Sequence, residues 1–258
     1  MNNSQVLIRK ELLQLWRCKK ILILLITACF IAAISPLLAK YMPELLRMMV
    51  TASGQNAVIE LPEPTFIDAY SQLFKNMDFI GMFIIILVFS GTIVEERTGG
   101  TAVLVLTKNV TRTQFIICKF LSDVIAFIVV YLVFATVFFA YSNFLFSDFP
   151  ADRFILAFLA YLSYFLFLIG VTAFASTLGK SFTITALVAF IVFFGTSLTR
   201  FIPHVKSYTP GNITGIIHEM LEGSVSGGDL WYPSIIAVVI AVLLVFLSTV
   251  IFNKQEDI

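Results

Sequence analysis

The sequence predicts an all-α membrane protein with six transmembrane helices, an N-terminal interfacial helix and short helices in its loops. Of the 258 residues, 59% are hydrophobic and only 13% are charged. A soluble domain is nearer half apolar and a quarter charged. The apolar residues also gather into six runs, most of them close to the roughly 20 residues that cross a bilayer. Composition and spacing together exclude a soluble globular domain.

The first expected element is a helix over residues 3–17. Its apolar residues share one face that includes Trp16, and cationic side chains such as Arg9 and Lys10 lie beside that face. This pattern is typical of a helix that lies in the membrane interface with its cations toward anionic lipid. The alternative is an ordinary helix that flanks the first span.

The six spans are expected at residues 21–39, 79–94, 120–141, 154–178, 182–199 and 231–252. The second run is short, and we expect the helix before it to lengthen it. Residues 40–78 and 200–230 form two long loops; Pro43 opens a short helix in the first, and residues 212–221 form an amphipathic helix in the second. Without an internal repeat, residues 1–258 are interpreted as one transmembrane domain.

The distribution of lysine and arginine predicts the orientation. With six spans both termini lie on one side, and that side, which also holds residues 95–119, carries eleven of these cations against six on the other. Cytoplasmic loops carry the excess of lysine and arginine. We therefore expect a multi-pass protein of the cell membrane with both termini in the cytoplasm and the two long loops outside.

Few charged residues interrupt the spans. Asp123 is interpreted as the only acidic residue inside one, and it follows Lys119 by four positions. That spacing favours a helical ion pair over a proton relay. Without a charged group at the middle of a span, a proton-driven pump or a charged-ring channel is not expected. The net charge of +1 and the lack of a basic cluster give no sign of a nucleic-acid partner.

One fragment resembles a nucleotide-binding loop. Leu178-Gly-Lys-Ser181 matches the end of that motif, but Phe174 stands where its first glycine is required, and the fragment lies in a tight turn between spans. The motif needs a strand, a loop and a helix in succession. We therefore expect no cofactor on this chain, and any ATP that drives it must be bound by another subunit.

An intramembrane metalloprotease is the alternative from a different class of protein. It would use Glu95 or Glu96 with His204 and His218. A catalytic zinc site needs three ligands that converge on one point. Here the glutamates are expected at the inner surface and the histidines outside. No metal site is therefore expected, and the cysteines also lack the spacing of one: Cys18, Cys29 and Cys118.

The polar stretch at residues 95–119 separates the second and third spans. Gly99 and Gly100 interrupt any continuous helix, and residues 101–106 form a short apolar patch between polar flanks. A small amphipathic element of this kind on the inner face is well placed to contact a cytoplasmic partner. An ordinary interhelical loop with solvated charges is the alternative.

This stretch resembles the ATP-binding cassette type-2 permeases. The resemblance rests on the order Glu95-Glu96, Gly100-Thr101, Leu104, Leu106-Thr107, Val110-Thr-Arg112 and Lys119. The six-span layout with its interfacial helix extends it over the whole chain. Two positions depart from the family pattern: Asn109 replaces the usual proline, and Cys118 replaces a frequent glycine before the lysine.

The resemblance implies a transporter subunit that is not itself an enzyme. In this family the loop forms a coupling helix that sits in a groove of a cytoplasmic ATPase, and two permeases, identical or homologous, assemble with two ATPase subunits that bind ATP and Mg. The residues expected to form the ATPase-coupling contact are Glu95, Glu96, Arg97, Gly100, Thr101, Leu104, Leu106 and Arg112.

The cargo is expected to be apolar or amphipathic because the chain has 27 phenylalanines and few charges in its spans. A stripe on the third span is the candidate cargo path, unless it faces lipid or packs between helices: Phe120, Phe127, Tyr131, Phe134 and Phe138. Permeases of this length resemble peptide exporters, which predicts export of an amphipathic or antimicrobial peptide. Sodium or drug extrusion is the alternative within the family, and maturation of a metalloprotein is a further one.

Overall fold

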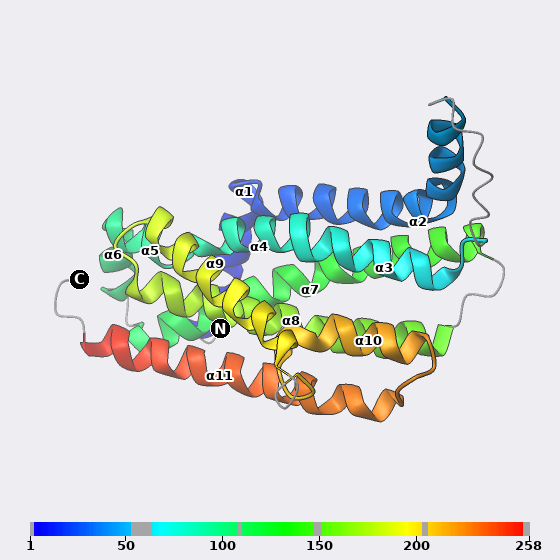
Figure 1. Ribbon diagram of the computed structural model, residues 1–258. Coiled ribbons are helices and arrows are strands. Elements are labelled where there is room, and N and C mark those ends of the chain that lie inside the picture. The colour runs from blue at the N-terminus through cyan, green and yellow to red at the C-terminus, as the bar shows by residue number, and fades with distance from the viewer. Residues whose placement is uncertain (1–2, 53–62, 108–109, 147–150, 203–205, 255–258) are drawn as a thin grey trace.

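The computed structural model confirms the all-α membrane fold. It describes residues 3–52, 63–107, 110–146, 151–202 and 206–254. Within these residues every regular element is helical, and the long helices run side by side in one bundle (Figure 1). Six stretches are long and apolar enough to cross a membrane: Lys20–Val50, Phe66–Thr98, Arg112–Leu145, Ala151–Leu178, Phe182–Phe201 and Gly227–Lys254.

The described helices follow one another along the chain as α1 (Asn3–Arg17), α2 (Lys20–Ala52), α3 (Phe66–Asn76), η1 (Met77–Gly81), α4 (Met82–Ser90), α5 (Val94–Thr98), α6 (Thr101–Leu106), α7 (Arg112–Leu145), α8 (Ala151–Leu178), α9 (Phe182–Leu198), η2 (Thr199–Phe201), η3 (Pro210–Asn212), α10 (Ile213–Leu221), η4 (Gly227–Leu230) and α11 (Trp231–Lys254). Helix α1 lies across the long helices (Figure 1). We name the two ends of the bundle after the short helices nearest to them, the α6 end and the α10 end (Figure 1).

The first span is longer than the sequence predicts. Helix α2 continues through Pro36 and Pro43 to Ala52, whereas we expected a break after residue 39 and a separate helix from Pro43. A proline removes one backbone hydrogen bond and bends a helix without necessarily ending it. Beyond the bundle this helix turns away from its neighbours (Figure 1).

The second span also includes residues that were assigned to the first long loop. Helices α3, η1 and α4 follow one another without a break, and η1 is a π-helical turn. The expected lengthening by the preceding helix therefore extends the helical rod back to Phe66, where Thr65 and Asp68 form a capping box. As a consequence Asp78, in η1, lies inside a span, so Asp123 is not the only acidic residue in one.

The third span starts at Arg112 rather than at residue 120. Thr111 has extended backbone angles, its hydroxyl accepts from the backbone N–H of Gln114, and the Gln114 side chain accepts from the backbone N–H of Thr111. This capping box satisfies backbone donors that have no partner at a helix start. The helix that follows therefore begins within the polar stretch.

Helix α8 is the most enclosed of the described spans: 67% of its most apolar segment is buried, against 22% for α9. It packs closely on α11, where a Cβ added at Gly170 would lie 3.0 Å from Cα of Ala241. Small residues allow membrane helices to approach in this way. The core of the bundle is thus built around α8, and α9 and α11 expose wide apolar surfaces.

Candidate functional site

The candidate functional site is the α5–α6 hairpin and the groups that hold it. Helix α5 ends at Thr98, and Gly100 adopts the left-handed conformation with φ of 70° before α6 begins. Residues with a Cβ rarely adopt this conformation, and glycine does so at little cost. The hydroxyl of Thr101 donates to the carbonyl of Glu96 at 3.3 Å and closes the turn.

Replacing Gly100 by alanine tests the role of this turn. No atom lies within 4 Å of the added Cβ, so only backbone strain should act, and we expect a loss of about 1–2 kcal/mol in the free energy of unfolding. Gly195 in α9 is the matched control, because its Cβ position is also open and its φ is not positive. Equal effects of Gly100→Ala and Gly195→Ala in detergent-based unfolding would contradict the strain argument.

Helix α6 presents apolar side chains in two directions. Ala102 is buried, and Val105 and Leu106 are half-buried against the small cluster of Ile93, Ala102, Phe115, Ile116 and Phe252. On the other side Val103 and Leu104 are 44% and 65% exposed. Of the two leucines predicted to contact a partner, the structure therefore leaves Leu104 accessible and uses Leu106 in part to hold the hairpin.

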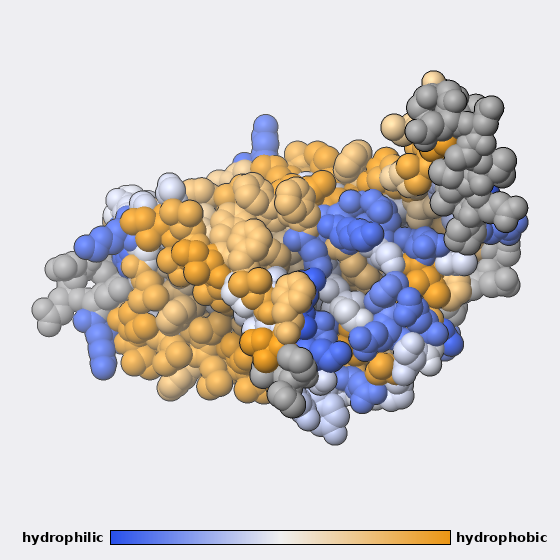
Figure 2. Space-filling model, in the orientation of Figure 1, coloured by the Kyte–Doolittle hydropathy of each residue, from blue (hydrophilic) through white to orange (hydrophobic). Residues whose placement is uncertain are grey.

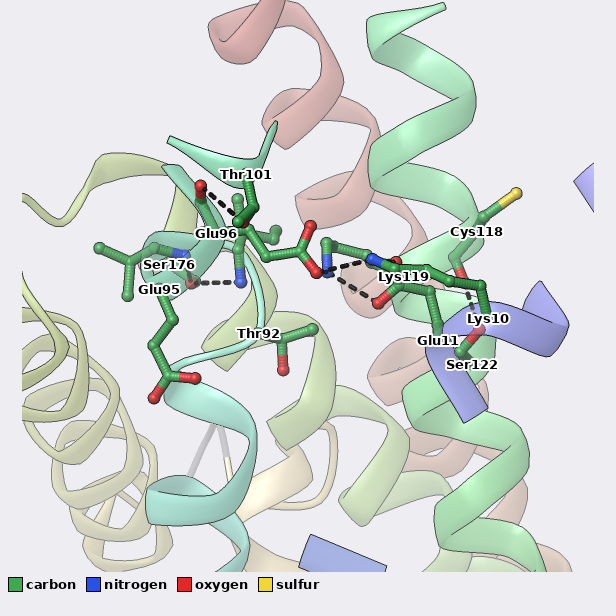
Figure 3. Close-up of polar contacts among 12 residues, drawn as sticks. Lys10, Glu11, Thr92, Glu95, Glu96, Thr101, Cys118, Lys119, Ser122 and Ser176 are labelled. Carbon is green, nitrogen blue, oxygen red and sulfur yellow. Dashed lines mark hydrogen bonds and ion pairs between the residues drawn. The ribbon is translucent and has the colours of Figure 1, made fainter. Parts of the chain in front are cut away.

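A closed ring of four charges anchors the base of the hairpin (Figure 3). Glu96 Oε1 accepts from Nζ of Lys10 at 2.9 Å and from Nζ of Lys119 at 3.0 Å. Glu11 accepts from the same two amines, both at 2.8 Å. The ring joins α1, α5 and α7, and we call these four residues the charge ring.

The charge ring is mostly withdrawn from solvent. The side chains of Lys119, Glu11 and Glu96 are 1%, 4% and 6% exposed, and that of Lys10 is 41% exposed. Burial opposes the charge of Lys10, but the hydrogen bonds and charges of Glu11 and Glu96 outweigh it and raise the pKa of its ammonium group. Lys119 Nζ also lies 5.1 Å from the centre of the Phe115 ring, within cation–π range.

The predicted ion pair between Lys119 and Asp123 is wrong. In the described residues the ion pairs of Lys119 are to Glu11 and Glu96, and Asp123 Oδ1 has no hydrogen-bond partner there. The helical spacing allows a contact with Asp123, but two carboxylates from α1 and α5 approach the amine more favourably. Asp123 is 2% exposed.

A second set of contacts ties the hairpin to the turn between α8 and α9. The guanidinium of Arg97 donates to the carbonyl of Thr177 at 2.8 Å and also to that of Gly179. The hydroxyl of Ser176 accepts from the backbone N–H groups of Ile93 and Val94 at 3.1 and 2.9 Å. Because these carbonyls end α8 and lack helical partners, Arg97 caps that helix.

The other residues predicted for the coupling contact lie around this base. Glu95 is exposed and pairs with Lys20 at 3.3 Å. Arg112 Nη1 donates to the carbonyl of Phe252 near the end of α11 at 3.3 Å. Lys108 and Asn109 lie outside the described residues. The structure thus brings the predicted residues to one end of the bundle, where Glu96, Arg97 and Arg112 are engaged within the chain.

The predicted aromatic stripe lies in the core of the bundle. Phe120 is partly buried, whereas the other four side chains are at most 5% exposed: Phe127, Tyr131, Phe134 and Phe138. The hydroxyl of Tyr131 donates to the carbonyl of Phe158 on α8 at 2.8 Å. The stripe packs between α7 and α8 in this conformation, and a role in the cargo path stays a prediction.

The described groups that were considered for a protease lie at opposite ends of the molecule. Glu95 and Glu96 belong to α5, whereas His218 belongs to α10 at the other end (Figure 1), and His204 is outside the described residues. Within the part of the chain that the structure describes, no three histidine, cysteine or acidic side chains gather as metal ligands.

Sequence reasoning missed Asp78. Its Oδ1 accepts from the hydroxyl of Tyr161 at 2.8 Å, and its Oδ2 from the hydroxyl of Thr214 at 3.4 Å. It was assigned to a loop because it directly precedes the apolar run that starts at Phe79. The amphipathic pattern of residues 66–76 is the signal that could have placed it within a longer helix.

These features define a multi-span membrane protein with a braced polar hairpin at one end, the architecture of a transporter's membrane domain. The chain belongs to the ABC-2 family of transporter proteins, whose family model matches residues 5–256. It is also similar to the uncharacterized transmembrane protein YxlG of Bacillus subtilis (strain 168), with 24% identity over 185 residues, 70% of each chain. The predicted permease family is confirmed, and the peptide-exporter branch stays a prediction.

Proposed function

We propose that this chain is the permease subunit of an ATP-driven exporter and that a separate cytoplasmic ATPase docks on the α5–α6 hairpin. The excess of lysine and arginine on the side of this hairpin supports a cytoplasmic location for it and for both termini. The cell membrane is the proposed location. Two such permeases, identical or homologous, would assemble with two ATPase subunits that bind ATP and Mg.

The observation that supports this proposal is the exposure of Leu104 on a firmly held hairpin. Its side chain is 65% exposed, whereas the charge ring and Arg97 fix the base of α5 to α1, α7 and α8. An accessible apolar side chain on a rigid support suits insertion into a groove, because removing its apolar surface from water favours docking. The base can then transmit a displacement of the tip to the spans.

Leu104→Asp tests the docking site. We expect capture of the ATPase by the tagged permease to fall about tenfold or more, because a carboxylate would have to enter an apolar groove. Expression and thermal stability should stay unchanged, since the side chain is exposed. The measurement is the amount of ATPase that copurifies, together with ATP turnover of the complex.

Leu45→Asp is the matched control, because Leu45 is 48% exposed and belongs to α2 beyond Pro43. It should leave ATPase capture unchanged. The permease purified alone should turn over no ATP. The proposal would be refuted if the Leu104→Asp variant captured as much ATPase as the wild type. It would also be refuted if the permease alone hydrolysed ATP.

For the cargo we propose an apolar or amphipathic molecule, with an amphipathic or antimicrobial peptide as the first candidate. The aromatic stripe on α7 supports this choice only if α7 and α8 separate during transport, because its rings now pack against Phe158 and Phe165. If transport requires α7 and α8 to separate, the aromatic stripe would line part of the cargo path.

Asp78 favours the second candidate, extrusion of sodium or of a drug, where the transported species carries a positive charge. The expectation of an apolar cargo rested partly on spans with few acidic groups, and Asp78 adds one within the second span. Ionisable residues within membrane spans are costly and are usually functional. ATP-driven uptake of ²²Na⁺ by inside-out vesicles, compared with uptake of a labelled peptide, separates the two candidates.

A further inference from the structure

Asp78 lies within the second of the six apolar stretches, Phe66–Thr98. Tyr161, which donates to it, is the eleventh residue of α8 counted from the α10 end. At 1.5 Å of rise per residue this is about 15 Å along the helix, which is roughly half the thickness of the hydrocarbon region. The carboxylate therefore lies part of the way along a stretch that is long and apolar enough to cross a membrane, where an isolated charge is unfavourable.

The contacts of Asp78 leave its negative charge without an ion pair. Both of its hydrogen-bond donors are neutral hydroxyls, and no cation of the described residues lies within ion-pair distance. Arg200 acts on it electrostatically from η2, but its Nε donates to the carbonyl of Ser197 at 2.8 Å. The carboxylate can accept further hydrogen bonds.

The surroundings hold this carboxylate in a fixed position. The Tyr161 ring is fully buried and lies against Phe74 and Phe165, with ring centres 5.0 and 4.6 Å apart. Asp78 itself belongs to the π-helical turn η1, a feature that is rare within helices and frequent at functional sites. The packed tyrosine therefore holds the carboxylate of the π-helical turn in one position.

Asp78 is also accessible. It is half-buried, as is Thr214 on α10, and Arg200 is exposed. Figure 2 shows hydrophilic side chains over α3 and α10 and hydrophobic ones over the part of α9 and α11 toward the α6 end. Helix α3 directly precedes the turn η1 that carries Asp78, and α10 carries Thr214, so the half-buried carboxylate belongs to the part of the chain with this hydrophilic surface.

We propose that Asp78 is a recognition site for a positively charged amino or guanidino group of the transported ligand, with Tyr161 and Thr214 as positioning residues. This inference rests on the proposed export function and adds a charge requirement to it. An ammonium group supplies the missing counter-charge and further hydrogen-bond donors in addition to the two hydroxyls. Arg200 would set the strength of binding by repelling the same group.

The test uses the full-length permease in phosphatidylcholine nanodiscs, whose neutral lipid does not itself attract cations. The probes are a dansylated amphipathic peptide that contains lysines and the same peptide with every lysine acetylated. The wild type should bind the lysine form at least about tenfold more tightly. Asp78→Asn should remove this preference and leave binding of the acetylated form unchanged, and Asp78→Glu should retain part of it.

Two controls make the result specific. Asp68→Asn changes an exposed carboxylate in the first turn of α3 and should keep the preference. Arg200→Ala should strengthen binding of the lysine form, because it removes a competing positive charge. An Asp78→Asn permease that keeps the preference, or one that loses both peptides equally with an unchanged melting temperature, would overturn the proposal.

The same test distinguishes this inference from sodium binding and from the proposal of ATPase docking. Displacement of the peptide by sodium chloride, but not by choline chloride at equal concentration, would overturn the ammonium assignment in favour of sodium. Binding needs no ATPase, so Leu104→Asp should leave it intact. The Leu104→Asp variant could still copurify the ATPase while the Asp78→Asn variant loses the preference for the lysine peptide. In that case the docking proposal would fail and the recognition site would stand.

Discussion

Lys119→Met should lower the free energy of unfolding by about 3–5 kcal/mol, the cost of breaking a buried ion pair on one side. Without this amine, Glu11 and Glu96 keep only Lys10, which is the most exposed member of the charge ring. Two carboxylates would then face each other with one partially hydrated cation between them. Unfolding of the purified permease by SDS titration in mild detergent measures the loss.

The chain provides a matched control in Lys20→Met. Lys20 forms an ion pair of 3.3 Å with Glu95, but the two side chains are 21% and 52% exposed. Exposed pairs contribute about 0–1 kcal/mol. A further variant, Lys119→Met with Glu11→Leu, leaves Lys10 opposite Glu96 and should recover part of the stability. Losses of the same size for Lys119→Met and Lys20→Met would show that the charge ring does not stabilise the fold.

Arg97→Glu should abolish ATP-driven transport while the ATPase still copurifies. The new carboxylate would face the carbonyls of Thr177 and Gly179, which now accept hydrogen bonds from the guanidinium. The carboxylate and the carbonyl oxygens are all hydrogen-bond acceptors and would repel one another at the end of α8. The hairpin would therefore detach from the α8–α9 turn. Leu104 would stay exposed, so docking should persist although movement of the hairpin no longer reaches α8.

Uptake of the dansylated lysine peptide into inside-out vesicles measures this effect, and copurification measures docking. Lys180→Glu is the control, because it reverses an exposed charge next to the same turn. It should reduce transport little, whereas Arg97→Lys should retain part of the activity through one donor. Normal uptake by Arg97→Glu would show that the link between α5 and α8 plays no part in transport.

The role of each charge in the hairpin could not be derived from the sequence. Glu95 and Glu96 are adjacent and identical in type, yet Glu95 is exposed and Glu96 is almost fully enclosed. A shift of one position on a helix turns a side chain by about 100°. Which of the two faces α1 and α7 depends on how α5 is oriented against those helices.

Asp123 and Asp78 show the same limit. Lys119 and Asp123 have the four-residue spacing that favours an ion pair on a helix. Lys119 instead forms an ion pair with Glu11, which lies 108 residues away along the chain. Asp78 was assigned to a loop because hydropathy alone places the start of the second span at the next residue. Its position became clear only from the continuous helix through η1 and its hydrogen bond to Tyr161.

The sequence by itself determined the helical membrane fold, the family and the place of the hairpin, because hydropathy, the glycine pair and the order of the loop residues are local properties of the chain. The tertiary structure alone decided which charges are buried together, which leucine of α6 stays accessible and that Asp78 lies within a span beside Tyr161. These features depend on contacts between helices distant along the chain, and an unpaired charge is costly only where that packing excludes water.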